Sequence, residues 1–332
     1  MPERFLVVRL GSLGDIVHTF PAVAGLRASF PSSEIIWLTH PRWVDLVSCS
    51  ALATHIWSVD SRDLSSVRPI LKQIRQQKWH SAIDYQGLWK SAFLPFLGGV
   101  SKRIGFSSAT IREFGVPILY TDSVRCRTTH IADQNGELSA RAGAVTPVAS
   151  VSLQVSDADA ERVRNDLARQ NITRYVVLSP GGGWRSKCWP AERFGALSRK
   201  IHAELGIPCV INYGPGEEAL AAQVRAAAGN PAPVAYDGEM GTLPALLRRA
   251  LCIVGGDTGP LHLAIALGTP AVALFGPTDP TRNGPYPPPG TVLRSPNAVT
   301  SYARSNTTDP SLLDLSVDAV FQAVRQRIGA SA

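Results

Sequence analysis

Short apolar segments alternate with helical segments along almost the whole chain, and this alternation limits the possible folds more than any other feature of the sequence. In the first half, strands are predicted at Phe5–Leu10, Glu34–Leu38, His55–Val59, Ser81–Tyr85 and Arg103–Phe106. In the second half, they are predicted at Tyr175–Ser179, Cys209–Tyr213, Val234–Tyr236, Cys252–Val254 and Ala271–Phe275. This βαβα order predicts an α/β fold with parallel sheets that helices cover on both faces.

Helical patterns lie between these strands, and the length of the chain predicts two domains. The expected helices are Ile16–Phe30 (bent at Pro21), Leu64–Gln77, Leu88–Phe96, Ile131–Ala142, Ala191–Leu205, Glu217–Ala227, Leu243–Arg249, Gly259–Leu267 and Ser316–Ile328. With 332 residues the chain exceeds one typical domain, and the βα rhythm pauses at about 144–172. We therefore expect two doubly wound domains, 1–150 and 151–332, facing a cleft, with the last helix a candidate to pack back on the first domain.

Composition narrows the class of protein. No apolar run approaches the roughly 18–20 residues of a membrane span, and Phe5–Leu10 is too short for the apolar part of a signal peptide. The five cysteines are scattered without a CxxC pair, which is typical of small packed side chains rather than of metal ligands. We expect a soluble protein of the cytoplasm.

Positive charge is concentrated in one part of the first half. Residues 62–127 contain 11 Lys/Arg and 4 Asp/Glu, a net charge of +7, which equals that of the whole chain. The stretch is either an ordinary solvated surface or a face that meets an anion. Nucleic acid is disfavoured as a partner because the chain has no zinc pattern, no basic helical tail and no basic strands interleaved with aromatic residues.

The loop after the first strand, "RLGSLGDIVHTFP", is rich in glycine but lacks a dinucleotide fingerprint. It has Gly11 and Gly14 and no third glycine, and the second strand ends at His40 without the acidic residue that holds a ribose. An NAD-dependent enzyme is therefore disfavoured. Asp15 begins a helix, where it is either a capping acid or a general base at the floor of the cleft.

A second glycine-rich loop, "SPGGGWRSKCWP", follows the strand at 175–179. Three glycines precede Arg185 and Lys187, and a helix begins after Pro190. Backbone N–H groups and a lysine at the start of a helix suit phosphate oxygens, although the pattern is not a Walker A loop. The alternative is that both cations are merely solvated.

The segment "VGGDTGPLHLAIALGTPAVALFGPTDP" carries the most information. Asp257, Thr258 and Gly259 open a helix after a strand, and the free N–H groups of its first turn suit an anion. Capping alone would explain Asp257, and a single histidine such as His262 is more often packed than bound to a ligand. A second loop of the same kind, "FGPTDP", follows the next strand and favours a ligand site.

Four segments, "RLGSLGDIVHTFPA", "DYQGLWKSA", "GGGWRSKCWP" and "GDTGPLHLAIALGTPAVALFGPTDP", together resemble the ADP-heptose:lipopolysaccharide heptosyltransferases, glycosyltransferase family 9. The resemblance runs in order from Arg9 to about Tyr286. The segment "DYQGLWKSA" is most similar to heptosyltransferase I, which adds the first heptose to the Kdo sugar of the inner core. The family has the GT-B fold, in which two Rossmann-like domains face a central cleft.

The resemblance also implies roles for individual residues. It implies that domain 1–150 binds the acceptor and that domain 151–332 binds the nucleotide-sugar. The implied reaction is inverting transfer of heptose from ADP-heptose to a Kdo hydroxyl of Kdo-lipid A, with Asp15 as the general base. The implied donor-site residues are Gly14, Lys187, Glu217 or Glu218, Asp257, Thr258, Gly259 and His262. Basic residues of the 62–127 stretch, namely Lys90, Lys102, Arg103 and Arg112, are the acceptor-side candidates.

No metal ion and no cofactor is expected. The one Asp-x-Asp, Asp157–Asp159, begins a helix after the domain junction and is interpreted as a cap at Ser156 or Asp157. Lys187 and backbone N–H groups could neutralise a diphosphate instead of a metal. Because the acceptor's lipid lies in the inner leaflet, we expect peripheral contact with the cytoplasmic face of the inner membrane.

Two other functions suit the same fold. A GT-B enzyme with a different nucleotide-sugar, either another transferase or an epimerase, would keep the cleft and change the sugar. A two-domain sugar-binding protein without catalysis would keep the glycine-rich loops and would tolerate the loss of Asp15.

Overall fold

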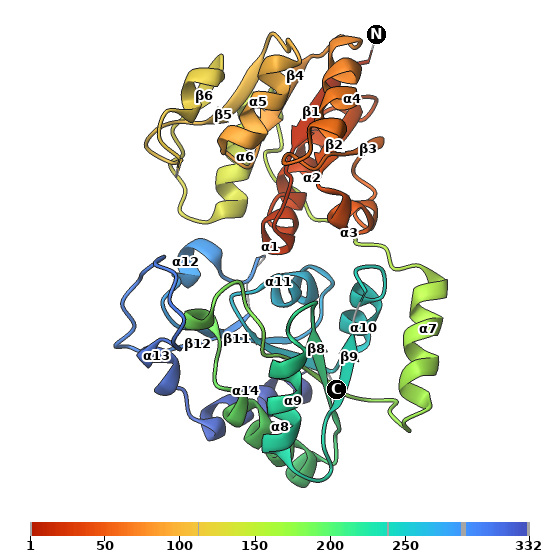
Figure 1. The fold of residues 1–332 in the computed structure, drawn as a ribbon, viewed down its shortest axis with the longest axis vertical. Coiled ribbons are helices and arrows are strands. Elements are labelled where there is room, and N and C mark those ends of the chain that lie inside the picture. The colour runs from red at the N-terminus through yellow and green to blue at the C-terminus, as the bar shows by residue number, and fades with distance from the viewer. Residues whose placement is uncertain (1, 112, 238, 287–289, 331–332) are drawn as a thin grey trace. The chain divides into compact units, whose positions relative to one another are not determined.

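The computed structural model describes residues 2–111, 113–237, 239–286 and 290–330. The chain divides into two compact units, Met1–Gln154 and Val155–Ala332, next to the sequence-derived boundary at 150. Figure 1 follows the chain through both units, from red at the N-terminus to blue at the C-terminus. Each unit contains one six-stranded sheet in which all strand pairs are parallel.

The sheet of the first unit has the strand order β3-β2-β1-β4-β5-β6. The strands are β1 (Arg4–Val8), β2 (Glu34–Thr39), β3 (His55–Ser58), β4 (Ser81–Asp84), β5 (Arg103–Phe106) and β6 (Asp122–Val124). The helices are α1 (Leu13–Val17), α2 (Phe20–Ser29), η1 (Pro41–Trp43), α3 (Val44–Ser48), α4 (Leu64–Arg75), α5 (Trp89–Leu97), η2 (Val116–Leu119) and α6 (Ile131–Arg141).

Alternation along the central strand explains the layers of this unit. Leu6 and Val8 of β1 pack in one cluster with Ile70 and Ile74 of α4 and Leu94 of α5. Successive side chains of a strand point to opposite faces, so the neighbouring residues of β1 point to the other face. There α2 and α6 pack together. Because both faces are covered, the strand reads as a continuous apolar run.

The sheet of the second unit has the order β12-β11-β10-β7-β8-β9. Its strands are β7 (Val176–Ser179), β8 (Cys209–Tyr213), β9 (Val234–Asp237), β10 (Cys252–Gly256), β11 (Ala271–Phe275) and β12 (Thr291–Arg294). Its helices are α7 (Asp157–Ala168), η3 (Arg185–Lys187), α8 (Ala191–Leu205), α9 (Glu218–Ala228), α10 (Leu243–Arg249), α11 (Gly259–Ala266), α12 (Pro280–Asn283), α13 (Pro310–Leu313) and α14 (Val317–Gly329).

Both sheets reverse their strand order beside their first strand. In the first unit β1 lies between β2 and β4, and in the second unit β7 lies between β8 and β10. In the first unit, the loops that follow β1 and β4 therefore leave neighbouring strands at the carboxyl edge of the sheet and diverge there. The loops that follow β7 and β10 do the same in the second unit. In open α/β sheets this topological switch point is where ligands bind. The topology thus selects one pair of loops in each unit.

The predicted strands are confirmed at ten positions, and the structure adds two that the sequence pattern did not reveal. These are β6 and β12, which form one edge of each sheet, and β12 lies in the stretch 277–310, which is rich in Pro, Gly, Ser and Thr. The single helix predicted at Ile16–Phe30 is wrong, because α1 ends before His18 and α2 begins at Phe20.

Two smaller predictions concern caps and packing. Ser156, not Asp157, caps α7, and its hydroxyl oxygen accepts a hydrogen bond from the Asp159 backbone N–H at 3.1 Å. The helix α14 packs against α8, β10 and β11 inside its own unit, with Val320 and Phe321 fully buried in that core.

Candidate functional site

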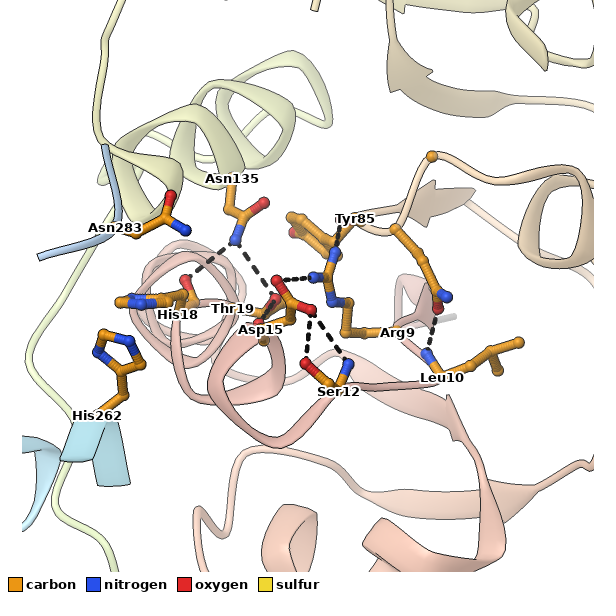
Figure 2. A network of polar contacts seen from close by, with 12 residues as sticks. Arg9, Leu10, Ser12, Asp15, His18, Thr19, Tyr85, Asn135, His262 and Asn283 are labelled. Atoms are coloured by element: carbon orange, nitrogen blue, oxygen red, sulfur yellow. Dashed lines mark hydrogen bonds and ion pairs between the residues drawn. The ribbon is translucent and has the colours of Figure 1, made fainter. Parts of the chain in front are cut away.

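The loop that leaves β1 holds an ion pair between Arg9 and Asp15. The Arg9 side chain is only 7% exposed, whereas that of Asp15 is 45% exposed, and Nη2 lies 2.7 Å from Oδ1. The other amino group of the guanidinium donates to the backbone carbonyl of Tyr85, directly after β4 (Figure 2). Arg9 therefore joins the two loops of the switch point.

Ser12 binds the second oxygen of the same carboxylate. Its backbone N–H donates to Oδ2 of Asp15 at 3.1 Å and its hydroxyl group donates at 2.8 Å (Figure 2). Arg9 and Ser12 thus hold one carboxylate oxygen each, so the orientation of the group is fixed while nearly half of its surface stays accessible. The Trp43 side chain packs against the backbone at Gly11, and this contact requires glycine because a Cβ there would lie 2.7 Å from Nε1 of Trp43.

A side chain of α6 stabilises the break between α1 and α2. Nδ2 of the buried Asn135 donates to the carbonyl of His18 at 3.0 Å and to Oγ1 of Thr19 at 3.3 Å. The Thr19 hydroxyl in turn donates to the carbonyl of Asp15 at 2.8 Å. These bonds satisfy backbone groups that the end of a helix leaves unpaired.

The loop that leaves β4 is organised by the buried carboxylate of Asp84. It accepts four hydrogen bonds, from Gln86 N at 2.9 Å, Gly87 N at 3.2 Å, Ser91 Oγ at 2.8 Å and Tyr120 Oη at 2.8 Å. Burial raises the pKa of Asp84 although these bonds favour its ionised form. The network fixes the backbone that presents the Tyr85 carbonyl to Arg9.

In the second unit, the loops of the switch point bring together Lys187, Asp257 and His262. Nζ of Lys187 lies 2.6 Å from Oδ2 of Asp257, and these side chains are 10% and 6% exposed. Nε2 of His262 lies 2.9 Å from Oδ1 of the same carboxylate. Nζ also lies 4.2 Å from the centre of the Trp184 ring. Asp257 therefore orients a lysine and a histidine at once.

The electrostatics of this cluster favour an ionised carboxylate. Burial by itself would raise the pKa of Asp257, but the hydrogen bond and charge of His262 and the charge of Lys187 outweigh it and lower the pKa. An ionised carboxylate is a hydrogen-bond acceptor only, so Nε2 of His262 donates to it.

The glycines of the second unit allow close approach of backbone and side chains. A Cβ at Gly181 would lie 2.1 Å from Oε1 of Glu217, and one at Gly256 would lie 2.7 Å from the Lys187 carbonyl oxygen. Glu217 also accepts a hydrogen bond from the Gly214 backbone N–H at 2.9 Å. The Glu217 carboxylate therefore lies against the glycine-rich loop.

Two threonine hydroxyls lie beside these loops without a hydrogen-bond partner. Oγ1 of Thr258, the residue before α11, and Oγ1 of Thr278, in the loop after β11, are buried and unpaired within the described part of the chain. The N–H groups of Thr258 and Gly259 precede the first intrahelical bond of α11, from His262 N to the Thr258 carbonyl. Buried polar atoms of native proteins normally have partners, so this arrangement is typical of a ligand site.

The other predicted site residues are dispersed. Gly14 lies in α1 of the first unit, and Glu218 is an exposed first residue of α9 whose carboxylate accepts from Gly216 N at 3.1 Å. Lys90 is exposed on the first turn of α5, near the carboxyl edge of the sheet. Lys102 and Arg103 lie at the opposite, amino edge, because Arg103 pairs with Ala82 at the start of β4. Arg112 lies outside the described residues.

The sequence interpretation missed the role of Arg9. An arginine directly after a buried strand, two residues before a glycine-rich turn, was the available signal, since a buried guanidinium needs a carboxylate or carbonyl partner.

Among the described residues, no group of three or more His, Cys, Asp or Glu side chains has the arrangement of a metal site. None of the described helices has the length and hydropathy needed to cross a bilayer.

Comparison with solved structures identifies the fold. The chain is similar to a glycosyltransferase family 9 structure from Veillonella parvula DSM 2008, with a TM-score of 0.86 and 22% identity over 99% of this chain and 98% of the other. It is also similar to the Escherichia coli heptosyltransferase WaaC with ADP, with a TM-score of 0.78 and 24% identity over 98% and 99%. The fold is that of the GT-B glycosyltransferases.

Comparison of sequences gives the family. The model of glycosyltransferase family 9 (heptosyltransferase) matches residues 67–310, and the chain belongs to this family. It is 27% identical over 297 residues to lipopolysaccharide heptosyltransferase 1 of Pseudomonas aeruginosa, a match that covers 85% of this chain and 81% of that protein. The protein is therefore a glycosyltransferase, as the sequence motifs predicted.

Proposed function

We propose that the protein transfers heptose from ADP-heptose to a Kdo hydroxyl of the lipopolysaccharide inner core, with inversion at the anomeric carbon. Family membership and the similarity to a type 1 lipopolysaccharide heptosyltransferase support heptose transfer. The observation that carries the proposal is the Lys187–Asp257–His262 cluster at the switch point of the second unit. It offers positive charge beside unpaired polar groups, which suits the diphosphate of a nucleotide-sugar.

The donor diphosphate is assigned to Lys187 and to the N–H groups of Thr258 and Gly259. When the bond between the anomeric carbon and the phosphate oxygen breaks, its electron pair leaves with ADP, and fixed positive groups stabilise the developing charge. The anionic Asp257 would repel a phosphate, so we assign it to positioning Lys187 and His262. We assign His262 to the donor sugar or phosphate. These groups supply the charge that a metal ion supplies in other transferases, and we propose a metal-independent reaction.

Between the two glutamates at the start of α9, we assign Glu217 to the nucleoside. Its carboxylate lies against Gly181 and the N–H of Gly214, whereas Glu218 lies on the exposed first turn of α9. A carboxylate beside the glycine-rich loop can accept hydrogen bonds from ribose hydroxyls.

Asp15 is assigned as the general base. The acceptor hydroxyl gives its proton to the carboxylate while its oxygen forms the bond to the anomeric carbon and ADP leaves. A base must be held within hydrogen-bond reach of the proton that it removes. Arg9 and Ser12 provide this fixed orientation in an accessible loop, and we treat both as positioning residues.

On the acceptor side, Lys90 suits the Kdo carboxylate or a lipid A phosphate best, because it lies on the first turn after the β4 loop. Lys102 and Arg103 lie at the far edge of the sheet, and Gly14 belongs to the Asp15 loop and not to the donor loops. The assignments of Lys102 and Arg103 to the acceptor and of Gly14 to the donor stay predictions.

The test is a transfer reaction with purified protein, Kdo-lipid A and a panel of nucleotide-sugars. We expect a product only with ADP-heptose, an anomeric configuration opposite to that of the donor by NMR, and an unchanged rate in EDTA. Transfer from a different nucleotide-sugar would overturn the donor assignment. Loss of turnover in EDTA that one divalent ion restores would overturn the metal-independent mechanism.

A further inference from the structure

The backbone ladder between β1 and β4 stops at the switch point of the first unit. Its last bond runs from Tyr85 N to the Val8 carbonyl oxygen at 3.1 Å. In a regular parallel pair, the next bond would run from Leu10 N to the Tyr85 carbonyl oxygen. Each of these two backbone groups binds a side chain instead. The two strands therefore part exactly one bond before the glycine-rich turn that carries Asp15.

Two side chains from opposite strands replace the missing bond. Oε1 of Gln86, two residues after β4, accepts a hydrogen bond from Leu10 N at 2.7 Å. Arg9, directly after β1, donates to the Tyr85 carbonyl oxygen (Figure 2). Each side chain thus crosses to the backbone of the other strand, and both backbone groups stay paired. The N–H of Leu10 can only donate, which fixes the Gln86 amide with its oxygen toward β1.

The carboxylate of Asp84 fixes the backbone from which Gln86 reaches β1. It accepts from Gln86 N at 2.9 Å and from Gly87 N at 3.2 Å, so the chain turns directly after β4. The same carboxylate is buried and also binds Ser91 and Tyr120. The turn is therefore held from inside the unit, and the half-buried Gln86 side chain extends from it to Leu10.

The position of the Arg9 guanidinium depends on the Tyr85 carbonyl. Nη1 donates to that oxygen, and Nη2 lies 2.7 Å from Oδ1 of Asp15. Nε is buried and has no hydrogen-bond partner in the part of the chain that the structure describes. If the ladder closed by one more bond, the Tyr85 carbonyl would turn toward Leu10 N. The guanidinium would then lose its support, and Asp15 would lose the contact that orients Oδ1.

We propose that Gln86 is a positioning residue for the general base Asp15. Its amide oxygen occupies Leu10 N and so keeps the ladder open, which leaves the Tyr85 carbonyl to Arg9. The inference rests on the proposed function, in which Asp15 removes the proton of the acceptor hydroxyl. Removal of this proton requires a carboxylate within hydrogen-bond reach in a fixed orientation, so a displaced Asp15 lowers the rate of the chemical step.

Steady-state kinetics of Gln86→Met with ADP-heptose and Kdo-lipid A test the proposal. Methionine has nearly the length of glutamine but lacks the amide oxygen. We expect kcat to fall about 10- to 100-fold with both KM values within about twofold of wild type, since misplacement of a reacting group by about 1 Å costs up to about 100-fold. The matched control is Gln77→Met, which removes the glutamine that accepts from Arg4 at the start of β1. It should keep the wild-type kcat.

The crystal structure of Gln86→Met gives a readout that does not depend on activity. We expect Leu10 N within hydrogen-bond distance of the Tyr85 carbonyl oxygen, and Arg9 displaced from Asp15. Unchanged positions of Arg9 and Asp15, or a wild-type kcat, would overturn the positioning role.

The kinetic outcomes also separate this role from its alternatives. A raised KM for Kdo-lipid A at unchanged kcat would overturn the positioning role and assign Gln86 to acceptor binding. If the wild-type protein transfers no heptose, the proposed function fails and the role of Gln86 fails with it. An active wild type beside an equally active Gln86→Met overturns the role of Gln86 alone.

Discussion

The ion pair between Lys187 and Asp257 predicts an unequal response to removal of its two partners. At 2.6 Å and an effective dielectric constant of about 20, the attraction is about 6 kcal/mol, and it is opposed by desolvation of several kcal/mol for each ion. Asp257→Leu leaves a buried ammonium group without its carboxylate. We expect this variant to lose about 3–5 kcal/mol of unfolding free energy.

Lys187→Met should cost less, because Asp257 keeps His262 at 2.9 Å as a partner. The expected loss is about 1.5–3 kcal/mol, the range for a hydrogen bond to a charged group. The double variant Lys187→Met/Asp257→Leu removes both charges and should be more stable than Asp257→Leu alone. Replacing both partners of a buried pair with apolar side chains is often neutral or stabilising.

Native-state hydrogen exchange of the backbone amides of β7 and β10 in the full chain measures these differences within the second unit. The reasoning is refuted if Lys187→Met destabilises these strands more than Asp257→Leu. It is also refuted if the double variant loses the sum of the two single losses, since additive losses mean that the two charges do not interact.

Three further predictions follow from the same contacts. Below about pH 4 the unfolded state takes up a proton at Asp257 that the folded state resists. The contribution of Asp257 to the free energy of unfolding is therefore full above that pH and falls as the pH decreases. Urea unfolding at each pH should show a smaller decrease between pH 6 and pH 3 in Asp257→Asn than in the wild type. Gly181→Ala should displace the Glu217 carboxylate and raise the KM for the donor about tenfold with little change in kcat, whereas Gly183→Ala, with open space at its Cβ, should not. Ser12→Ala should lower kcat about three- to tenfold at unchanged donor KM, because the hydroxyl, one of the three groups that orient the Asp15 carboxylate, is lost. Equal turnover in steady-state assays would contradict a positioning role.

The sequence was sufficient for ten strands and insufficient for one edge strand of each sheet. Central parallel strands are buried on both faces, so segments such as Phe5–Leu10 are continuous apolar runs that stand out from the helices around them. The edge strands β6 and β12 are short and only partly buried. Their residues do not form such runs, and β12 lies among the prolines and glycines of 277–310.

The candidate site was predicted unevenly for a similar reason. Motifs singled out Lys187, Asp257 and His262, which belong to loops 70 residues apart in the chain. Only the adjacency of β7 and β10 brings them together, and strand order is not encoded in local patterns. The Arg9–Asp15 pair and the amino-edge position of Arg103 were not foreseen although both have local signals in the sequence, namely an arginine after a buried strand and a predicted strand that begins at Arg103.

The ADP released by purified protein from ADP-heptose tests the central claim most directly, measured with and without Kdo-lipid A for wild type and Asp15→Asn. The account predicts release that requires the acceptor and that falls about 10²- to 10⁴-fold in Asp15→Asn, the usual contribution of a general base. Asp45→Asn, at an exposed carboxylate on α3 of the same unit, should retain wild-type turnover. Near-normal release by Asp15→Asn would contradict the assigned base, and release independent of the acceptor would contradict glycosyl transfer to Kdo.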